Sequence, residues 1–394
     1  MSGVMSEEEL ALPPPIIARA GNSAATASQW RLMAWRFSRH KLALVSLVIV
    51  VLLYLTGIFA EFLAPYSPET TRPQYTYAPP QGINLFAPTA DGGWAFNFHA
   101  SGYDITVDTE AMRRSFTANP DKIIPLGLFV EGQPYRLFGL IDANIHLIGA
   151  TDPKEVVYLF GSDRPGRDVL SRLIHGTRIS MSIGLVGVVI SLVLGVFFGG
   201  ISGYYGGWLD SVIQRLIEVT SAMPTIPLWM GLAAAIPLTW GPIEVYFTVT
   251  AIVSLLGWTS LAREVRGRFF SLRNEDFVTA ARLDGAGEMR IIFRQMLPSM
   301  TSHILAMVTL AVPAMIIAET SLSFLGVGLK PPVVSWGVLL QDAQNLRAIT
   351  SAPWLLFWPA LFVMVAVLSF NFLGVGRSQR RDREPRERFR VQLS

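Results

Sequence analysis

The segment LALVSLVIVVLLYLTGIFAEFL, residues 42–63, carries one charged side chain, Glu61, close to its end. A helix needs about 20 consecutive, mostly apolar residues to cross the hydrocarbon core of a bilayer, and this segment meets that need. Five later segments have the same character, at residues 180–204, 212–238, 246–263, 298–324 and 353–374. The sequence therefore predicts an all-α polytopic membrane protein with six transmembrane helices.

The overall composition favours the same class. Hydrophobic residues make up 51% of the 394 residues and charged residues only 15%, whereas soluble domains carry about 25% charged residues. The net charge of +3 does not indicate nucleic-acid binding, because the arginines gather beside the spans. The chain has no cysteine, so no disulfide can brace an exposed domain.

Basic residues predict how the chain is oriented. Lysine and arginine are frequent in the N-terminal tail (1–41), in the loop 264–297 and in the C-terminal tail (375–394). Cytoplasmic segments near span ends are enriched in these residues. We therefore expect both termini and the loop to face the cytoplasm, with residues 180–374 as the membrane core. The basic C-terminal tail is also suited to lie against lipid headgroups.

The long segment 64–179 is expected to lie outside the cytoplasm, between the first and second spans. Short aromatic runs alternate there with proline, glycine and aspartate, a pattern typical of short strands and turns. We predict a small β-rich extracytoplasmic insertion. Its last part, GSDRPGRDVLSRL (161–173), has apolar residues at helical spacing and is expected to form an amphipathic helix at the outer surface.

Small residues and two acidic residues stand out inside the spans. The second span has a small residue at every fourth position, which would let another helix approach closely; these are Gly187, Ser191, Gly195, Gly199 and Gly203. Glu218 and Glu319 must face protein or water, since a charge in lipid is costly. We expect Glu218 to hydrogen-bond a neighbouring helix, and Glu319 either to do the same or to line a path.

The residues needed for catalysis or nucleotide binding are missing from the sequence. None of the four lysines stands in a Walker A motif, so the chain is not expected to bind ATP by that route. No two of the five histidines have metal-ligand spacing, which argues against a metal site. The chain is thus not expected to be an enzyme, and uphill transport would draw on a partner or an ion gradient.

The loop TAARLDGAGEMRIIFRQMLP (279–298) is too helix-favouring to be an irregular connection. Asn274 is a suitable N-cap for a helix over 277–284, and Gly285 can end it by adopting a positive φ. A second helix is expected over 288–296, with Pro298 in the first turn of the fifth span. The loop is thus predicted to be two short helices joined by a glycine elbow.

This loop resembles the coupling loop of permease subunits of ABC importers, in which Glu-Ala-Ala is followed by three residues, Gly and a spaced Leu-Pro. Thr279 stands where the family has Glu. The segments WRFSRHKLALVSLVIVVLL, FGSDRPGRDVLSRLIHGTRISMSIGL, GYYGGWLDSVIQRLIE, AETSLSFLGVGLKPPVVSWG and APWLLFWPALFVMVAVLSFNFLG resemble the C-type permeases of the oligopeptide, dipeptide and nickel branch. This resemblance covers residues 30–63 and 158–374.

The resemblance implies a subunit of the bacterial inner membrane that imports peptides by alternating access. The partners would be a second homologous permease, two ATPase subunits that bind ATP and Mg, and an extracytoplasmic substrate-binding protein. The ATPase-coupling residues would be Thr279, Ala280, Ala281, Arg282, Asp284, Gly285, Arg290, Leu297 and Pro298. The translocation path would run between the two permeases, with Met223, Pro224, Pro227 and Glu319 as candidate lining.

Other functions stay open at this point. The same machine could carry oligosaccharides, opines or nickel. A stand-alone ion-coupled carrier is a different class, which the scarcity of charges inside the spans and the shaped loop both disfavour. A membrane scaffold without transport would not need that loop.

Overall fold

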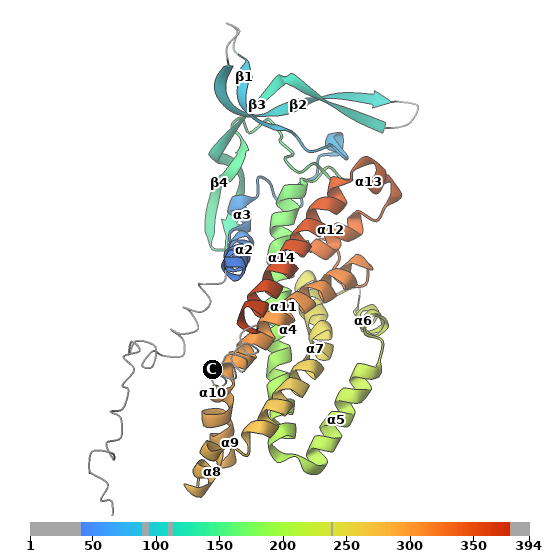
Figure 1. Ribbon diagram of the computed structural model, residues 1–394. Coiled ribbons are helices and arrows are strands. Elements are labelled where there is room, and N and C mark those ends of the chain that lie inside the picture. Colours follow the sequence, from blue (N-terminus) through green and yellow to red (C-terminus); the bar gives the residue numbers. More distant parts are fainter. Residues whose placement is uncertain (1–40, 89–93, 109–112, 238, 379–394) are drawn as a thin grey trace, which may run out of the picture.

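The computed structural model describes residues 41–88, 94–108, 113–237 and 239–378, so the N-terminal tail and most of the C-terminal tail lie outside the described residues. The helices are α2 (Lys41–Ile58), α3 (Ala60–Leu63), α4 (Val169–Tyr205), α5 (Gly207–Ala222), α6 (Thr225–Ala234), α7 (Pro242–Leu272), α8 (Asp276–Leu283), α9 (Glu288–Ile291), α10 (Leu297–Ser299), α11 (Thr301–Phe324), α12 (Trp336–Asp342), α13 (Leu346–Ser351) and α14 (Trp354–Ser378). A small sheet lies at one end of the helix bundle, and α8 and α9 lie at the other (Figure 1).

Five helices in the described part of the chain are long and apolar enough to cross a membrane: α2, α4, α7, α11 and α14. A sixth span exists only if α5 and α6 count as one, and these two helices meet at an angle of 86°. The third span predicted over 212–238 is thus not one straight helix, and the predicted count of six spans holds only if this bent pair is one span.

The break follows from Pro224. A proline forces the residue before it out of the helical region, and Met223 is accordingly extended, with φ −77° and ψ 135°. Pro227 falls in the first turn of α6, where a missing N–H leaves no helical hydrogen bond unmade. The two prolines thus end one helix and begin the next.

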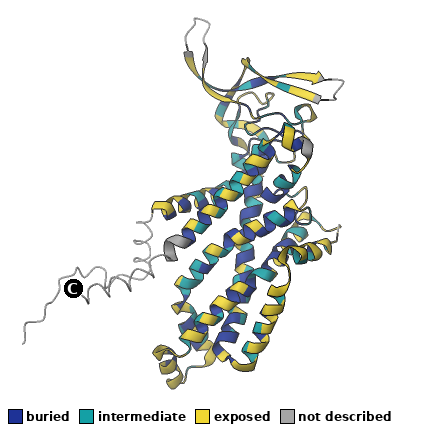
Figure 2. Ribbon diagram, turned by 45° about the vertical axis from the view of Figure 1, so that its right-hand side comes forward, coloured by how far each residue is buried: buried dark blue, intermediate teal, exposed yellow. Residues whose placement is uncertain are grey.

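Helices α4 and α7 lie side by side at the centre of the bundle. Around them pack α2, α11 and α14, and the main core cluster includes Met181, Ile183, Val253, Ile316 and Trp336. Figure 2 shows buried positions running along the middle of the bundle and exposed positions along its outer helices.

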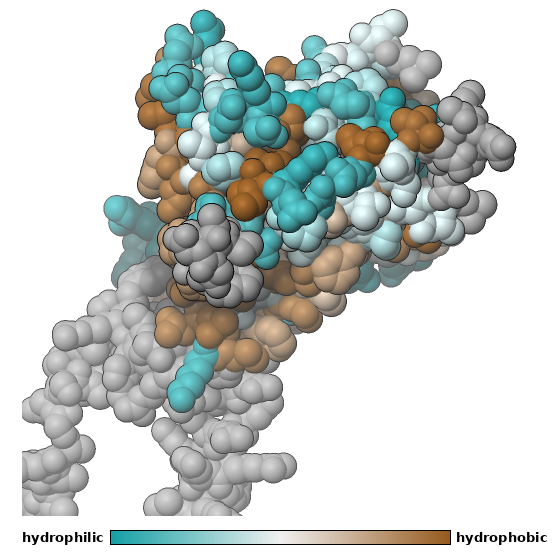
Figure 3. Space-filling model, turned by 90° about the horizontal axis from the view of Figure 1, so that it is seen from above, coloured by the Kyte–Doolittle hydropathy of each residue, from teal (hydrophilic) through white to brown (hydrophobic). Residues whose placement is uncertain are grey.

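The residues between α3 and α4 form a four-stranded antiparallel sheet in the order β1 (Ile83–Pro88), β2 (Trp94–Asp108), β3 (Arg113–Leu137) and β4 (Ile141–Ala150). This confirms the predicted small β-rich unit. The long strand β3 pairs with β2 through its first half and with β4 through its second half. Seen from the sheet end, the surface is largely hydrophilic, with separate hydrophobic patches (Figure 3).

A separate amphipathic helix at the outer surface is not formed. Asp168 caps α4 by accepting a hydrogen bond from the Ser171 N–H at 2.7 Å, so the predicted apolar stripe becomes the first turns of α4. Val169 packs with Ala343, Ala348 and Leu355 of the α12–α14 region. The stripe therefore faces protein, because tertiary contacts replaced the lipid surface that we expected.

Candidate functional site

The loop between α7 and α11 is folded as two short helices, at the end of the bundle away from the sheet (Figure 1). The N-cap of α8 is Glu275, one residue after the predicted cap Asn274. Helix α9 continues into a π-helical turn (Ile292–Met296) and then α10. The predicted pair of helices is present.

Gly285 forms the elbow between α8 and α9. Its φ is +73°, the left-handed region that side chains with a Cβ rarely adopt. The Gly285 N–H donates to the Arg282 carbonyl at 3.0 Å, and the Ala286 N–H donates to the Ala281 carbonyl at 3.0 Å. These two bonds make a Schellman motif, which satisfies the last carbonyls of α8 and fixes the turn.

The inner face of the loop belongs to a core cluster shared with the spans. Val278, Ala281, Ile291 and Met296 are buried together with Phe269 of α7. Apolar burial of this kind stabilises the folded loop by about 25 cal/mol per Å². The loop is therefore part of the helix bundle.

The outer face of the loop is exposed and partly apolar. Leu283 is 84% exposed, and Met289 and Phe293 are also mostly exposed. Arg290 is exposed beside them in the sequence. We call Leu283, Met289, Arg290 and Phe293 the loop tip. An exposed apolar group rimmed by polar residues is typical of an interaction surface.

Most of the predicted coupling residues lie on this exposed side, and two do not. The exposed ones are Thr279, Ala280, Arg282, Asp284, Gly285, Arg290 and Pro298. Ala281 is buried, because it packs toward Val278 and Ile291, and Leu297 is half-buried. Small size at Ala281 thus serves packing within this chain rather than approach by a partner.

Two aromatic residues at the end of α4 hold the loop. The Tyr205 hydroxyl donates to Glu288 at 2.8 Å. The Arg282 guanidinium lies 5.4 Å from the centre of the Tyr204 ring, within the range of a cation–π contact. These contacts would therefore transmit a movement of the loop to α4.

The small residues of α4 face α7. At three glycines of α4, an added Cβ would come too close to α7. The distance would be 2.7 Å from Gly195 to Leu261 Cβ and 2.4 Å from Gly199 to the Ala262 carbonyl oxygen. From Gly203 it would be 2.6 Å to the Arg266 carbonyl oxygen. Nearer the sheet, the Ser191 hydroxyl donates to the Ser254 carbonyl at 3.0 Å, and Gly187 lies against Ser254. The loop is thus connected to two closely packed central helices.

The candidate path residues are not brought together. Met223, Pro224 and Pro227 are exposed at the break between α5 and α6. Glu319 of α11 has no exposed surface and accepts hydrogen bonds from Ser335 at 2.7 Å, Ser323 at 2.9 Å and Ser180 at 3.3 Å. Of the two alternatives for Glu319, these contacts agree with hydrogen bonding to neighbouring helices. Glu319 joins α4, α11 and α12.

Glu218 also differs from its prediction. It lies on the exposed face of α5 and accepts a hydrogen bond from Arg215 at 3.0 Å, one turn away on the same helix. The expected hydrogen bond to a neighbouring helix is wrong, because α5 turns this face away from the rest of the chain.

A buried charge cluster near the sheet was not foreseen. The Arg172 side chain is 1% exposed, and its Nη1 donates to Asp163 at 2.7 Å and to Asp342 at 2.9 Å. Arg167 also bonds Asp163. The only sequence signal was the four-residue spacing of Asp163 and Arg167, since Asp342 is far away in the chain. The cluster ties the start of α4 to α12.

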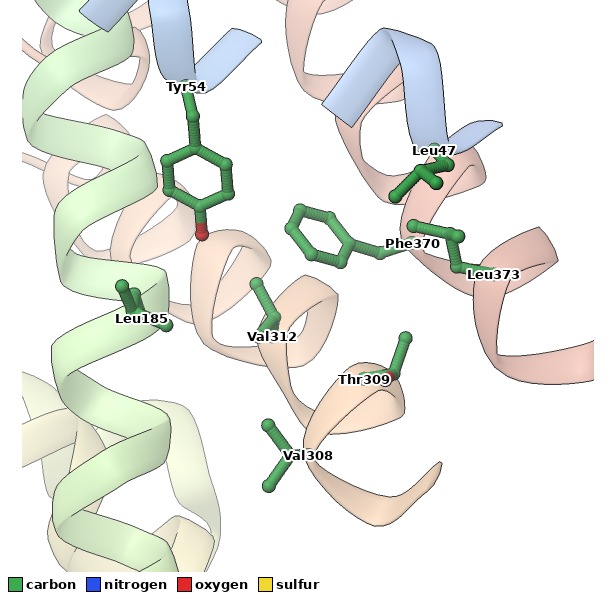
Figure 4. A pocket seen from close by; sticks show the side chains of 8 residues that line it. All are labelled: Leu47, Tyr54, Leu185, Val308, Thr309, Val312, Phe370 and Leu373. Carbon is green, nitrogen blue, oxygen red and sulfur yellow. The ribbon is translucent and has the colours of Figure 1, made fainter. Parts of the chain in front are cut away.

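An apolar cavity of about 430 Å³ lies among α2, α4, α11 and α14. Tyr54, Leu185, Val312 and Phe370 are among its lining residues, which are almost all hydrophobic (Figure 4). None of the candidate path residues lines it. In the described part of the chain, no group of three or more His, Asp or Glu is placed to hold a metal ion.

Comparisons with known proteins identify the class of the chain. The family model described as the binding-protein-dependent transport system inner membrane component matches residues 191–381. The model of the N-terminal transmembrane domain of oligopeptide transport permease C matches residues 28–80. The dipeptide transport system permease protein DppC of Bacillus subtilis is 40% identical over 57% of this chain and 68% of its own length. The chain belongs to this family of ABC peptide permeases.

Two further relatives of the permease are oligopeptide transport system permease proteins named OppC. That of Haemophilus influenzae is 35% identical over 63% of this chain and 78% of its own length. That of Bacillus subtilis is 29% identical over 92% of this chain and 93% of its own length.

Proposed function

We propose that this permease is one of two membrane subunits of an ATP-driven importer that carries oligopeptides or dipeptides into the cytoplasm. The family membership and the names of the relatives support the peptide substrate class. The partners would be a second permease, two ATPase subunits and an extracytoplasmic binding protein. ATP and Mg would be bound by the ATPase subunits.

The proposal rests on the exposed loop tip, whose inner face is packed into the helix bundle. Leu283, Met289 and Phe293 offer apolar surface, and Arg290 offers charge to an acidic neighbour. A groove on an ATPase subunit would cover this surface. The core cluster and the contacts of Tyr204 and Tyr205 would then pass the movement of that subunit to α4 and α7.

Orientation and path are part of the same proposal. The loop tip and both termini would face the cytoplasm, and the sheet would face the binding protein. Exposed Met223, Pro224 and Pro227 would contribute to a path between the two permeases, which would open alternately to the two sides. These three exposed residues lie at the 86° break, where the chain changes direction between α5 and α6.

Copurification from the native host in mild detergent tests the proposal. We expect the unaltered permease to bring down a second permease and two ATPase subunits. Arg290→Glu and Leu283→Asp should release the ATPase subunits and keep the second permease. Lys154→Glu, a charge reversal at an exposed residue between β4 and α4, is the matched control and should keep every subunit. ATPase subunits that stay bound to both loop variants would contradict the assignment.

A further inference from the structure

The hairpin of β3 and β4 ends in an exposed apolar tip. Hairpin turns in contact with water favour Asn, Asp and Gly, whereas this one reads Phe138-Gly139-Leu140-Ile141. Leu140 is 86% exposed, and Phe138 and Ile141 are more than half exposed. We call Phe138, Gly139, Leu140 and Ile141 the hairpin tip.

The change from polar to apolar along the hairpin is sharp. Arg136 and Asp142 face each other across the strands and form an exposed ion pair with a 2.9 Å hydrogen bond. Beyond this pair, toward the turn, every residue is apolar or glycine: Leu137, Phe138, Gly139, Leu140 and Ile141. A charged pair followed by an apolar end is suited to the boundary between lipid headgroups and acyl chains.

Contacts with α2 and α3 fix the direction of the hairpin. At its base, His146 lies 2.6 Å from the Ala64 carbonyl oxygen through Nδ1, and 2.9 Å from the Gln133 carbonyl oxygen through Nε2. At its tip, the Phe138 ring lies 6.0 Å from the Phe59 ring. Ala64 follows α3, whereas Phe59 directly follows α2. From base to tip, the hairpin thus runs back along α3 to the end of the first membrane-spanning helix.

The view in Figure 1 agrees, since the hairpin descends from the sheet beside α3 to the level of α2. At the same level, the Arg178 guanidinium of α4 donates to both carboxylate oxygens of Glu61 of α3, each at 2.6 Å. The hairpin tip therefore lies beside the carboxyl end of α2.

We propose that the hairpin tip is inserted into the membrane leaflet that the carboxyl end of α2 reaches, and that it anchors the sheet to the lipid. Leu140 and Ile141 would lie among the upper acyl chains, and the Arg136–Asp142 pair would lie among the headgroups. Phe138 would join the hairpin tip to α2 through its contact with Phe59. The proposal needs only that α2 spans the membrane, and it is independent of the coupling role of the loop tip.

Spin labels at single cysteines test the proposal. The chain has no cysteine of its own, so Leu140→Cys, Ile141→Cys and Phe96→Cys each give one label on this subunit. The labelled importer is reconstituted in phosphatidylethanolamine–phosphatidylglycerol nanodiscs, with a labelled unaltered complex to subtract thiols of the partners. Phe96 is an exposed apolar residue of β2 that pairs with Phe86 of β1, and β1 lies away from the lower end of the β3–β4 hairpin (Figure 1).

We expect labels at 140 and 141 to collide often with oxygen, which concentrates in lipid, and rarely with a water-soluble nickel complex. The label at 96 should show the reverse, with a ratio of the two collision rates that differs several-fold from that at 140. Equal nickel accessibility at 140, 141 and 96 would overturn the proposal. Shielding of 140 and 141 from both reagents would also overturn it, because a protein surface would then cover the tip.

Discussion

The Arg266 guanidinium donates to both carboxylate oxygens of Asp210, from Nε and from Nη2, each at 2.6 Å. Asp210 also accepts a hydrogen bond from Ser202. One carboxylate therefore joins α5 and α7 to the end of α4, close to the loop that we assign to ATPase coupling.

Replacing Arg266 with lysine should weaken this junction. Lysine keeps the charge but cannot match two oxygens with a planar fork. We expect Arg266→Lys to lower the free energy of unfolding by about 1–2 kcal/mol, measured by thermal unfolding of the purified permease. Arg215→Lys is the control, because its pair with Glu218 is exposed and should contribute little. Equal effects of the two substitutions would contradict this account.

Gly285 should tolerate only residues that accept a left-handed backbone. No atom of this chain lies within 4 Å of a Cβ added there, so within the permease alanine acts through backbone strain. We expect Gly285→Ala to destabilise α8 by about 1–2 kcal/mol, and Gly285→Asn by less, since asparagine enters this region more readily. The transport-coupled ATPase rate of the assembled importer is the readout. A variant with alanine that works better than one with asparagine would contradict the assignment of the elbow.

Close packing of α4 on α7 predicts opposite effects at two glycines. A larger residue at Gly199 would meet the backbone of Ala262, so Gly199→Leu should force the helices apart and remove most folded protein from the membrane. Gly267 of α7 has open space around it, and Gly267→Ala should be neutral or stabilising by about 0.5–1 kcal/mol. The fraction of protein that stays monodisperse in detergent measures both. Loss of folded protein with Gly267→Ala would count against the packing argument.

Asp168 predicts a dependence of stability on pH. Burial raises the pKa of this carboxyl from 3.8 to about 6, although hydrogen bonds from Ser171 oppose the change. The folded protein thus holds the proton more tightly than the unfolded chain. The resulting stabilisation is complete below pH 3.8 and is lost as the pH rises through about 6.

Asp168→Asn tests this dependence. Asparagine keeps an acceptor for the Ser171 N–H and does not ionise. Between pH 5 and pH 7, the unaltered permease should lose about 1–1.5 kcal/mol of stability relative to the variant. Melting temperatures of both proteins across this range give the difference. Parallel curves would show that the Asp168 proton does not stabilise the fold.

The spans and the loop could be predicted from sequence because their signals are local. Apolar length marked α2, α4, α7, α11 and α14. The positive φ available to glycine marked the elbow at Gly285. Pro224 lies inside the third span predicted over 212–238, yet its restriction of Met223 to extended backbone ends α5 completely.

The features that were missed depend on residues far apart in the chain. The buried Arg172 pairs with Asp342 of α12, which lies 170 residues later in the chain. Contacts with the α12–α14 region also make the predicted surface helix part of the packed first turns of α4. Glu319 could be recognised as a polar residue in a span, but its partners Ser180 and Ser335 come from other helices. Hydropathy carries no information on such pairings.

Site-specific photo-crosslinking from Leu283 tests the central assignment most directly. A benzophenone amino acid is placed at Leu283 in the host membrane and irradiated, with the same amino acid at Phe96 as a control of similar exposure. The account predicts an adduct between the Leu283 variant and a Walker A–containing ATPase subunit, and none from Phe96. A permease that yields no such adduct from Leu283, and still imports peptide when purified alone, would contradict it.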